Sequence, residues 1–475
     1  MRRSILIAVG LMVSGCATNP VTGKREFSLV SEAQEIEMGR QSLAASEAQS
    51  GFYNDPELEQ YIRDMGMAMA RASERPNLPW EFHVLDDRMI NAFAAPGGFI
   101  FVTRGILAVL NSGAELAGVL GHEIGHVTAK HSVVQMSNAT LAQVGLVAGA
   151  IAAPDMAASG VGQLAQAGAS LLFLKFGRDD ESQSDELGHR YSLQQGYDVR
   201  EMPKTFRTLQ RVGESAGEGS RIPAFMSTHP DPGNRVEATQ RMADTVSDYS
   251  KLTTDREHFL RLLDGLVYGE DPRQGYFEQN RFLHPVLKFQ FDKPANWQSV
   301  NYAVQLIMAE PNGQAQLTLG SASESTAAAA AQAFTGQQGI SVRSSGAITV
   351  NGIRGQAVAF TANTSQGQQL AGQVFYLEYG GQVYEILGLA LAQAWQQQGG
   401  AIDRAMRSFA PTAASQSFRR VRELHLVTLS ANTTPAVLAQ QSNGAGTAAE
   451  IALINGAQEN DTLPRGRMVK TIRWR

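Results

Sequence analysis

The chain has 475 residues and only one cysteine, Cys16, so no disulfide can form within it. Aromatic residues make up 7% of the sequence, while glycine occurs 46 times, which favours close helix packing over an aromatic-rich all-β protein. Excess positive charge is also absent, because the formal net charge is −5, and we therefore expect no nucleic-acid partner. The length indicates about three folded units.

Long uninterrupted hydrophobic runs are lacking as well. The most apolar internal stretch, residues 141–174, is rich in Ala and Gly but is interrupted by Pro154-Asp155, Gln163 and Gln166. No uninterrupted apolar run there is long enough to cross a bilayer. We read this stretch as two packed helices or a helical hairpin.

Residues 1–15 have the pattern of a secretion signal. Arg2 and Arg3 precede a short apolar run that ends in small residues before Cys16. Val13-Ser14-Gly15-Cys16 also resembles the bacterial lipobox, in which the cysteine is lipidated; the alternative is an ordinary signal peptide with an incidental cysteine. The first reading predicts a periplasmic protein of a Gram-negative bacterium, attached to the membrane through Cys16. In similar lipoproteins, Ala17 at the next position implies the outer membrane.

Changes in periodicity divide the rest of the chain. Residues 16–30 are turn-rich and predict a tether. Residues 31–275 are mainly helical, with helices expected near 31, 55–72, 104–135, 180–195, 201–212, 235–246 and 256–266, and a small sheet from strands at 80–85 and 98–103. Residues 283–410 alternate as strands with two helices, which predicts an antiparallel α+β domain. Residues 418–475 form a last small unit.

The strongest chemical signal is His122-Glu123-Ile124-Gly125-His126. Residues four apart on a helix lie one above the other, so both imidazoles can bind one zinc ion. Glu123 lies beside them and can take a proton from a zinc-bound water before delivering it to the leaving amine. The glycine and apolar residues around the motif indicate a buried helix rather than a chance match on a surface helix.

A catalytic zinc usually has three protein ligands and one open position. In the metzincin pattern the third ligand would be His at position 132, but that residue is Ser132, and His131 is one residue early and predicted to turn away from the metal. Glu181 and Asp185 lie four residues apart on one face of a helix, so Glu181 can bind zinc and Asp185 can orient a ligand imidazole. An acidic, solvated helix start explains the same residues equally well.

The chain resembles the CAAX prenyl protease and HtpX type of zinc metallopeptidase, a gluzincin family, and in particular its periplasmic lipoprotein branch of the BepA and LoiP type. The resemblance covers roughly residues 20–275. It rests on four segments in a shared order: Asn91-Ala92-Phe93-Ala94 with Pro96-Gly97-Gly98; the His122–His126 motif; Arg178 with Glu181 and Asp185; and Thr228-His229-Pro230 with Arg235.

The resemblance implies a zincin-like domain with one Zn²⁺ held by His122, His126 and Glu181. It implies that His229 gates the open zinc position or contacts the transition state, whereas a turn-stabilising histidine before Pro230 is the alternative. Residues 141–174 would form a lid. An extended substrate is expected to pair with the edge of one strand, formed by Phe99, Ile100, Phe101 and Val102.

Two departures from the family bear on function. The chain lacks the spanning helices of the membrane-embedded members, and an α+β domain stands where the BepA type has helical repeats. Residues 418–475 resemble a degenerate LysM module, which implies affinity for peptidoglycan; a structural cap is the alternative. The fold expected is therefore a mainly α-helical peptidase domain with a small sheet, an antiparallel α+β domain and a small LysM-like α/β unit.

These observations predict a zinc metalloendopeptidase of periplasmic protein quality control that cleaves unfolded or misassembled envelope polypeptides. A non-catalytic chaperone or assembly factor is the alternative from another class, although the intact Glu123 argues against it. A peptidoglycan-associated hydrolase is a third reading, suggested only by the last unit.

Overall fold

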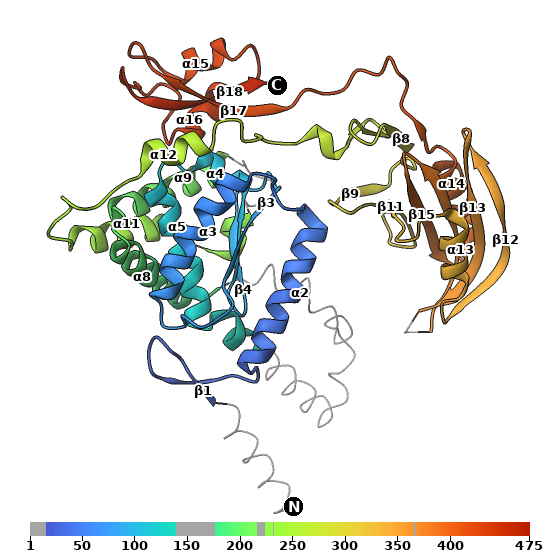
Figure 1. The fold of residues 1–475 in the computed structure, drawn as a ribbon, viewed down its shortest axis with the longest axis horizontal. Coiled ribbons are helices and arrows are strands. Elements are labelled where there is room, and N and C mark those ends of the chain that lie inside the picture. Colours follow the sequence, from blue (N-terminus) through green and yellow to red (C-terminus); the bar gives the residue numbers. More distant parts are fainter. Residues whose placement is uncertain (1–15, 139–175, 216–223, 231, 365–366) are drawn as a thin grey trace, which may run out of the picture. The chain divides into compact units, whose positions relative to one another are not determined.

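The computed structural model describes residues 16–138, 176–215, 224–230, 232–364 and 367–475 (Figure 1). Within these residues the chain forms two compact units, one of residues up to 47, 51–269 and 422–475, the other of residues 48–50 and 270–421. The expected signal peptide (1–15) and the expected lid (141–174) lie outside the described residues. Among the described residues, no helix is both long and apolar enough to cross a membrane.

The first unit is rich in helices, and several of them begin at polar residues whose side chains cap the helix. Ser31 forms a capping box with Gln34 at the start of α2, and Asp55 caps α3. These helices are α2 (Glu32–Ser50), α3 (Pro56–Arg71), α4 (Arg104–Val109), α5 (Gly113–Thr128), α8 (Arg178–Gln194), α9 (Met202–Ser215), α10 (Ala224–Thr228), α11 (Pro232–Asp244) and α12 (Arg256–Leu262). The expected helix-rich region is thus present.

The predicted helix over residues 104–135 is interrupted twice. Leu110 is extended (ψ 147°), and Ser112 then starts α5 by accepting a hydrogen bond from the Glu115 N–H. Lys130 adopts a left-handed conformation (φ 61°) just after α5, and residues 131–138 are helical again. The motif helix α5 is consequently a separate element of fixed length, and all of its residues are buried.

A three-stranded sheet lies beside α5. Its order is β3 (Glu81–Leu85), β5 (Phe99–Thr103), β4 (Ala92–Ala95), with β5 parallel to β3 and antiparallel to β4. The prediction that Phe99, Ile100, Phe101 and Val102 offer a free edge is therefore wrong, because β5 is hydrogen-bonded on both sides and fully buried. Within the described part of this sheet, the edge strand beside α5 is β4.

Residues 422–475 pack on the helix-rich part of the first unit. Strand β17 (Arg422–Thr428) pairs with β18 (Met468–Trp474), and helices α15 (Pro435–Gln441) and α16 (Ala448–Ile454) connect them (Figure 1). Leu424, Ile451 and Ile472 belong to the same hydrophobic core as Leu116 and Leu120 of α5. The last segment thus shares one core with the motif helix.

Residues 16–30, predicted as a tether, contain a short hairpin of β1 (Cys16–Thr18) and β2 (Arg25–Phe27). The buried Asn19 amide donates to the Ala129 carbonyl at the end of α5, 3.1 Å away. The described part of this stretch is therefore fixed to the first unit.

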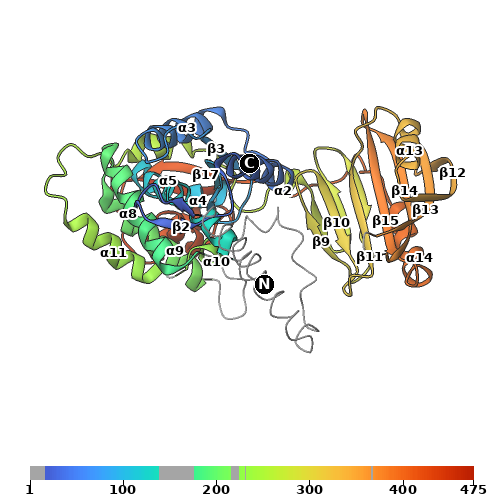
Figure 2. The same ribbon diagram turned by 90° about the horizontal axis from the view of Figure 1, so that it is seen from below.

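The second unit contains two antiparallel sheets and two helices, as expected for an α+β domain (Figure 2). A seven-stranded sheet has the order β12-β13-β14-β15-β11-β10-β9, and a smaller sheet has the order β16-β8-β7-β6. Helices α13 (Ala327–Thr335) and α14 (Trp395–Met406) pack on the larger sheet. Its strands are β9 (Gln298–Asn301), β10 (Gln305–Ala309), β11 (Ala315–Ser321), β12 (Ile340–Val350), β13 (Ile353–Asn363), β14 (Gln369–Tyr379) and β15 (Gln382–Leu391); the smaller sheet contains β6 (Tyr276–Glu278), β7 (Arg281–His284), β8 (Phe289–Asp292) and β16 (Ala410–Pro411).

Candidate metal centre

Helix α5 approaches α8 closely at two glycines. A Cβ added to Gly121 would lie 2.9 Å from Cα of Gly188, and one added to Gly125 would lie 3.1 Å from Cα of Ser184. Because larger residues would separate the two backbones, these glycines allow Glu181 of α8 to reach the imidazoles of α5. The side chains of His122, His126 and Glu181 are all at least 97% buried.

The donor atoms of four side chains lie close together. His122, His126, Glu181 and His229 each contribute an atom, and these atoms lie within 4.8 Å of one another. Nε2 of His126 lies 3.0 Å from Nε2 of His122 and 3.4 Å from Oε1 of Glu181. Nδ1 of His229 lies 3.3 Å from Nε2 of His122 and 2.9 Å from Oε1 of Glu181.

These separations suit a small tetrahedral cation. Bond lengths of about 2.0–2.1 Å around zinc place neighbouring donor atoms about 3.3 Å apart. The imidazoles of His122 and His126 and the carboxylate of Glu181 are also the donor set of a catalytic zinc site. The imidazole of His229 is the fourth donor, in place of the water or substrate that a catalytic site admits. The residues present therefore fit a zinc ion.

Asp185 lies behind His122, on the side away from the cluster. Its Oδ1 accepts from Nδ1 of His122 at 2.9 Å. Arg235 of α11 binds the same carboxylate through Nη2 (2.6 Å) and Nε (2.8 Å), and its Nη1 lies 2.7 Å from Oε2 of Glu181. One guanidinium thus ties together the carboxylates of Glu181 and Asp185.

Burial and neighbouring charges shift the pKa values of the cluster in different directions. Burial alone would raise the pKa of the Glu181 carboxyl, but the charges of His229 and Arg235 lower it far below its usual range. Burial alone would lower the pKa of His229, but Glu181 and Glu123 raise it. Burial lowers the pKa of His126 and raises that of Glu123. Glu181 is therefore held ionised, as a metal ligand must be.

Glu123 is placed next to the cluster but outside it. Its side chain is fully buried, and neither carboxylate oxygen has a hydrogen-bond partner among the described residues. Its Oε1 lies 3.7 Å from Nε2 of His229. A buried carboxylate with unused acceptor capacity is costly, which is consistent with a group that meets a substrate or water in the working site.

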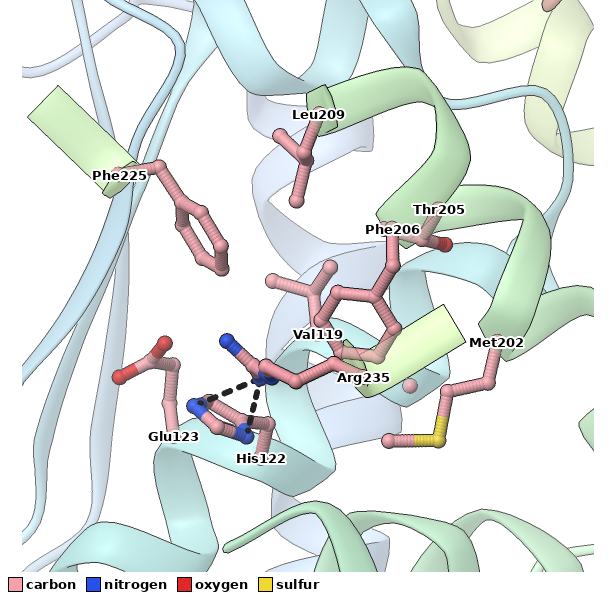
Figure 3. Close-up of a pocket in the computed structure, with 10 residues that line it drawn as sticks. Val119, His122, Glu123, Met202, Thr205, Phe206, Leu209, Phe225 and Arg235 are labelled. Atoms are coloured by element: carbon pink, nitrogen blue, oxygen red, sulfur yellow. Dashed lines mark hydrogen bonds between the residues drawn. The ribbon is translucent and has the colours of Figure 1, made fainter. Parts of the chain in front are cut away.

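The side of the cluster that carries Glu123 faces an apolar wall. Figure 3 shows His122, Glu123 and Arg235 opposite the side chains of Phe225 and Leu209. A cavity of about 500 Å³ lies between α8 and α11, and both Glu181 and Arg235 line it. The larger space next to the cluster is therefore the one between α8 and α11.

The structure brings together most of the residues that the sequence singles out. His122, His126, Glu181 and His229 meet, Asp185 contacts His122, and Glu123 lies beside them. The strand Phe99–Val102 contributes no side chain to this cluster. Sequence reasoning gave Arg235 a place in a motif but no role. It considered His131 only as a third metal ligand, whereas His131 lies outside the group of donor residues and contacts His126. No periodic signal could have found either contact.

Comparisons with known proteins agree with this site. Residues 56–243 match the sequence model of peptidase family M48. The chain is 30% identical over 235 residues to the beta-barrel assembly-enhancing protease of Escherichia coli O157:H7, covering 48% of each protein. It is 31% identical over 222 residues to the mitochondrial metalloendopeptidase OMA1 of Schizosaccharomyces pombe, covering 46% of this chain and 63% of that protein.

The chain spans about half the length of the bacterial relatives it matches. The matched region includes His122, Glu123, His126, Glu181 and His229. The resemblance to an HtpX-type zinc metallopeptidase that the motifs imply is therefore confirmed for this part of the chain.

Proposed function

We propose that the chain, whose residues 56–243 match the sequence model of peptidase family M48, is a zinc-dependent endopeptidase that hydrolyses unfolded polypeptides. The observation that carries this proposal is the buried cluster of His122, His126, Glu181 and His229 with the unpaired carboxylate of Glu123 beside it. A zinc ion bound by this cluster would supply a Lewis acid that polarises the scissile carbonyl and lowers the pKa of a water molecule.

The protein's own groups then divide the remaining work. Glu123 takes the proton from the attacking water and delivers it to the leaving amine. Its burial raises its pKa, which brings the carboxyl closer to the pH at which it must both accept and release that proton. Asp185 accepts from Nδ1 of His122, which fixes the tautomer whose Nε2 lone pair faces the cluster.

His229 is proposed as a gate. Its Nδ1 stands among the donor atoms of the cluster, while its Nε2 faces Glu123 at 3.7 Å. An imidazole in the fourth position closes a site that catalysis requires to be open. Movement of His229 away from the cluster would free that position, and the same imidazole could then contact the oxyanion of the transition state.

The substrate is proposed to add a strand to the sheet beside α5. Backbone pairing of this kind recognises extended chains with little dependence on their side chains. Because β5 is central, the edge that supports this proposal is β4 (Ala92–Ala95). Unfolded and misassembled polypeptides expose long stretches of unpaired backbone, whereas folded proteins pair most of their backbone groups internally.

The proposed setting is the periplasm of a Gram-negative bacterium, with the protein anchored through a lipidated Cys16 to the outer membrane. The lipobox-like sequence Val13-Ser14-Gly15-Cys16 supports the anchor. A relative named for enhancing β-barrel assembly supports a role in quality control of envelope proteins. Peptidoglycan affinity of the LysM-like residues 418–475 is a further part of this proposal.

A proteolysis assay with the purified chain tests the proposed function. The zinc-loaded protein is expected to cleave unfolded casein, to lose this activity in a strong chelator and to regain it when zinc is restored. A chaperone would instead prevent aggregation of unfolded casein without cutting it. Intact casein after prolonged incubation with zinc-loaded protein would exclude the endopeptidase.

A further inference from the structure

His131 has no part in the mechanism above, yet it is buried beside the cluster with only 6% of its surface exposed. It follows Lys130, whose left-handed backbone (φ 61°) forms a turn between α5 and the helical residues 131–138. The Lys130 ammonium lies 2.8 Å from the buried Glu35 carboxylate, to which Arg75 also binds at 2.7 Å. This network holds the turn that folds His131 back onto α5.

The two nitrogens of His131 face different partners. Nδ1 lies 2.9 Å from Nδ1 of His126 and 3.3 Å from Oγ of Ser184. Nε2 lies 2.9 Å from Oε1 of Gln183, and the half-exposed Asp180 carboxylate is farther away, at 3.8 Å. His131 therefore bridges His126 to the helix that carries Glu181.

The hydrogen positions follow from the requirement that His126 turns a lone pair on Nε2 toward the cluster. Its Nδ1 must then carry the proton and donate it, so Nδ1 of His131 must accept. A neutral His131 that accepts at Nδ1 carries its proton on Nε2, which donates to Oε1 of Gln183. The carboxamide oxygen of Gln183 can only accept, so this chain of hydrogen bonds has one direction.

We propose that His131 is a positioning residue that, together with Gln183, fixes the tautomer and ring orientation of His126 for metal binding. This inference rests on the proposed metal site and extends it. His131 does for His126 what Asp185 does for His122, with a neutral imidazole in place of a carboxylate. Phe176 stacks on the His126 ring, with centroids 4.0 Å apart, and closes that face of the imidazole.

The experiment measures the zinc dissociation constant of the full chain by competition with a chelator. Removing an orienting partner typically weakens metal binding about 10- to 100-fold. His131→Phe retains an aromatic ring without the acceptor and is expected to weaken zinc binding by about this factor. His131→Asn retains an acceptor near the position of Nδ1 and is expected to recover most of the affinity. Gln183→Met, which leaves Nε2–H of His131 without this acceptor, is expected to fall between these two variants.

His189→Phe is the matched control, because His189 lies on the same helix α8 and makes no hydrogen bond through Nε2 among the described residues. Its zinc affinity is expected to equal that of the wild type. Thermal unfolding of each metal-free variant separates loss of metal affinity from loss of fold. In the Co²⁺-substituted protein, the visible spectrum of His131→Phe should change, whereas that of His189→Phe should not.

Equal zinc affinity of wild type, His131→Phe and Gln183→Met would overturn the inference and leave the proposed function standing. If His131→Phe does not fold, the other two variants decide. A zinc affinity of His131→Asn that is no higher than that of Gln183→Met would then overturn the inference. A wild-type chain that binds no zinc would instead overturn the metal site itself, and the inference with it.

Discussion

The guanidinium of Arg235 holds the carboxylate of Asp185 at two points, with Nη2 2.6 Å from Oδ1 and Nε 2.8 Å from Oδ2. The same Oδ1 accepts from Nδ1 of His122 at 2.9 Å. Asp185 therefore connects a buried cation to a proposed zinc ligand, and a change at this residue affects both metal binding and stability.

Asp185→Asn keeps the size of the side chain and an acceptor for His122 but removes the charge that faces Arg235. We expect zinc affinity to fall about 10- to 100-fold. The free energy of unfolding should fall by about 3 kcal/mol, because Arg235 loses one of its two buried carboxylate partners. Chelator competition and urea unfolding measure the two effects. Glu186→Gln, an exposed change on the same helix, should produce neither effect; wild-type affinity in Asp185→Asn would contradict the assigned role.

His229→Ala removes the imidazole from the fourth position of the cluster but leaves His122, His126 and Glu181. If His229 gates the site, the variant should retain one zinc ion per chain and cleave unfolded casein faster than the wild type. Slower cleavage with zinc retained would assign His229 to the transition state instead. Zinc content and initial rates distinguish these results, and unchanged kinetics would remove both roles.

Lys470→Met tests whether residues 422–475 belong to the peptidase body. The Lys470 side chain is fully buried, and its Nζ donates to the carbonyls of Ala108 (2.8 Å) and Leu110, just before α5 begins. Removing Nζ leaves both carbonyls without this donor, which costs about 1–3 kcal/mol for each buried acceptor. We expect the free energy of unfolding of the first unit to fall by about 3 kcal/mol. Unfolding identical to that of Lys251→Met, an exposed change in the same unit, would indicate an independent C-terminal module.

The two pairs of residues on α5 and α8 could be predicted because their spacing is local, whereas the role of His229 follows only from the family resemblance. His122 and His126 lie four apart on one helix, and Glu181 and Asp185 lie four apart on another. The sequence alone does not show whether Glu181 is a metal ligand or a solvent-exposed acid at a helix start. The answer depends on how α8 packs against α5. The family resemblance supplied the assignment, and the close approach at Gly121 and Gly125 accounts for it.

Other features depend on contacts between distant segments. The sequence predicts β5 as an edge because it reveals the burial of this strand but not its neighbours, and it predicts no strand over the Ala-rich β4. The orientation predicted for His131 assumes a continuous helix, whereas the left-handed Lys130 interrupts the helix one residue earlier. Contacts such as Lys470 with Ala108, 362 residues apart, leave no periodic trace in the sequence.

The measurement that tests the central claim most directly pairs metal analysis with proteolysis in Glu123→Gln. Glu123 contributes no donor atom to the cluster, so the variant should bind one zinc ion per chain with wild-type affinity. Loss of the general base should slow cleavage of unfolded casein by about 10²- to 10⁴-fold. Zinc retention with this loss of activity is the predicted result. Cleavage by Glu123→Gln at the wild-type rate would contradict the proposed mechanism.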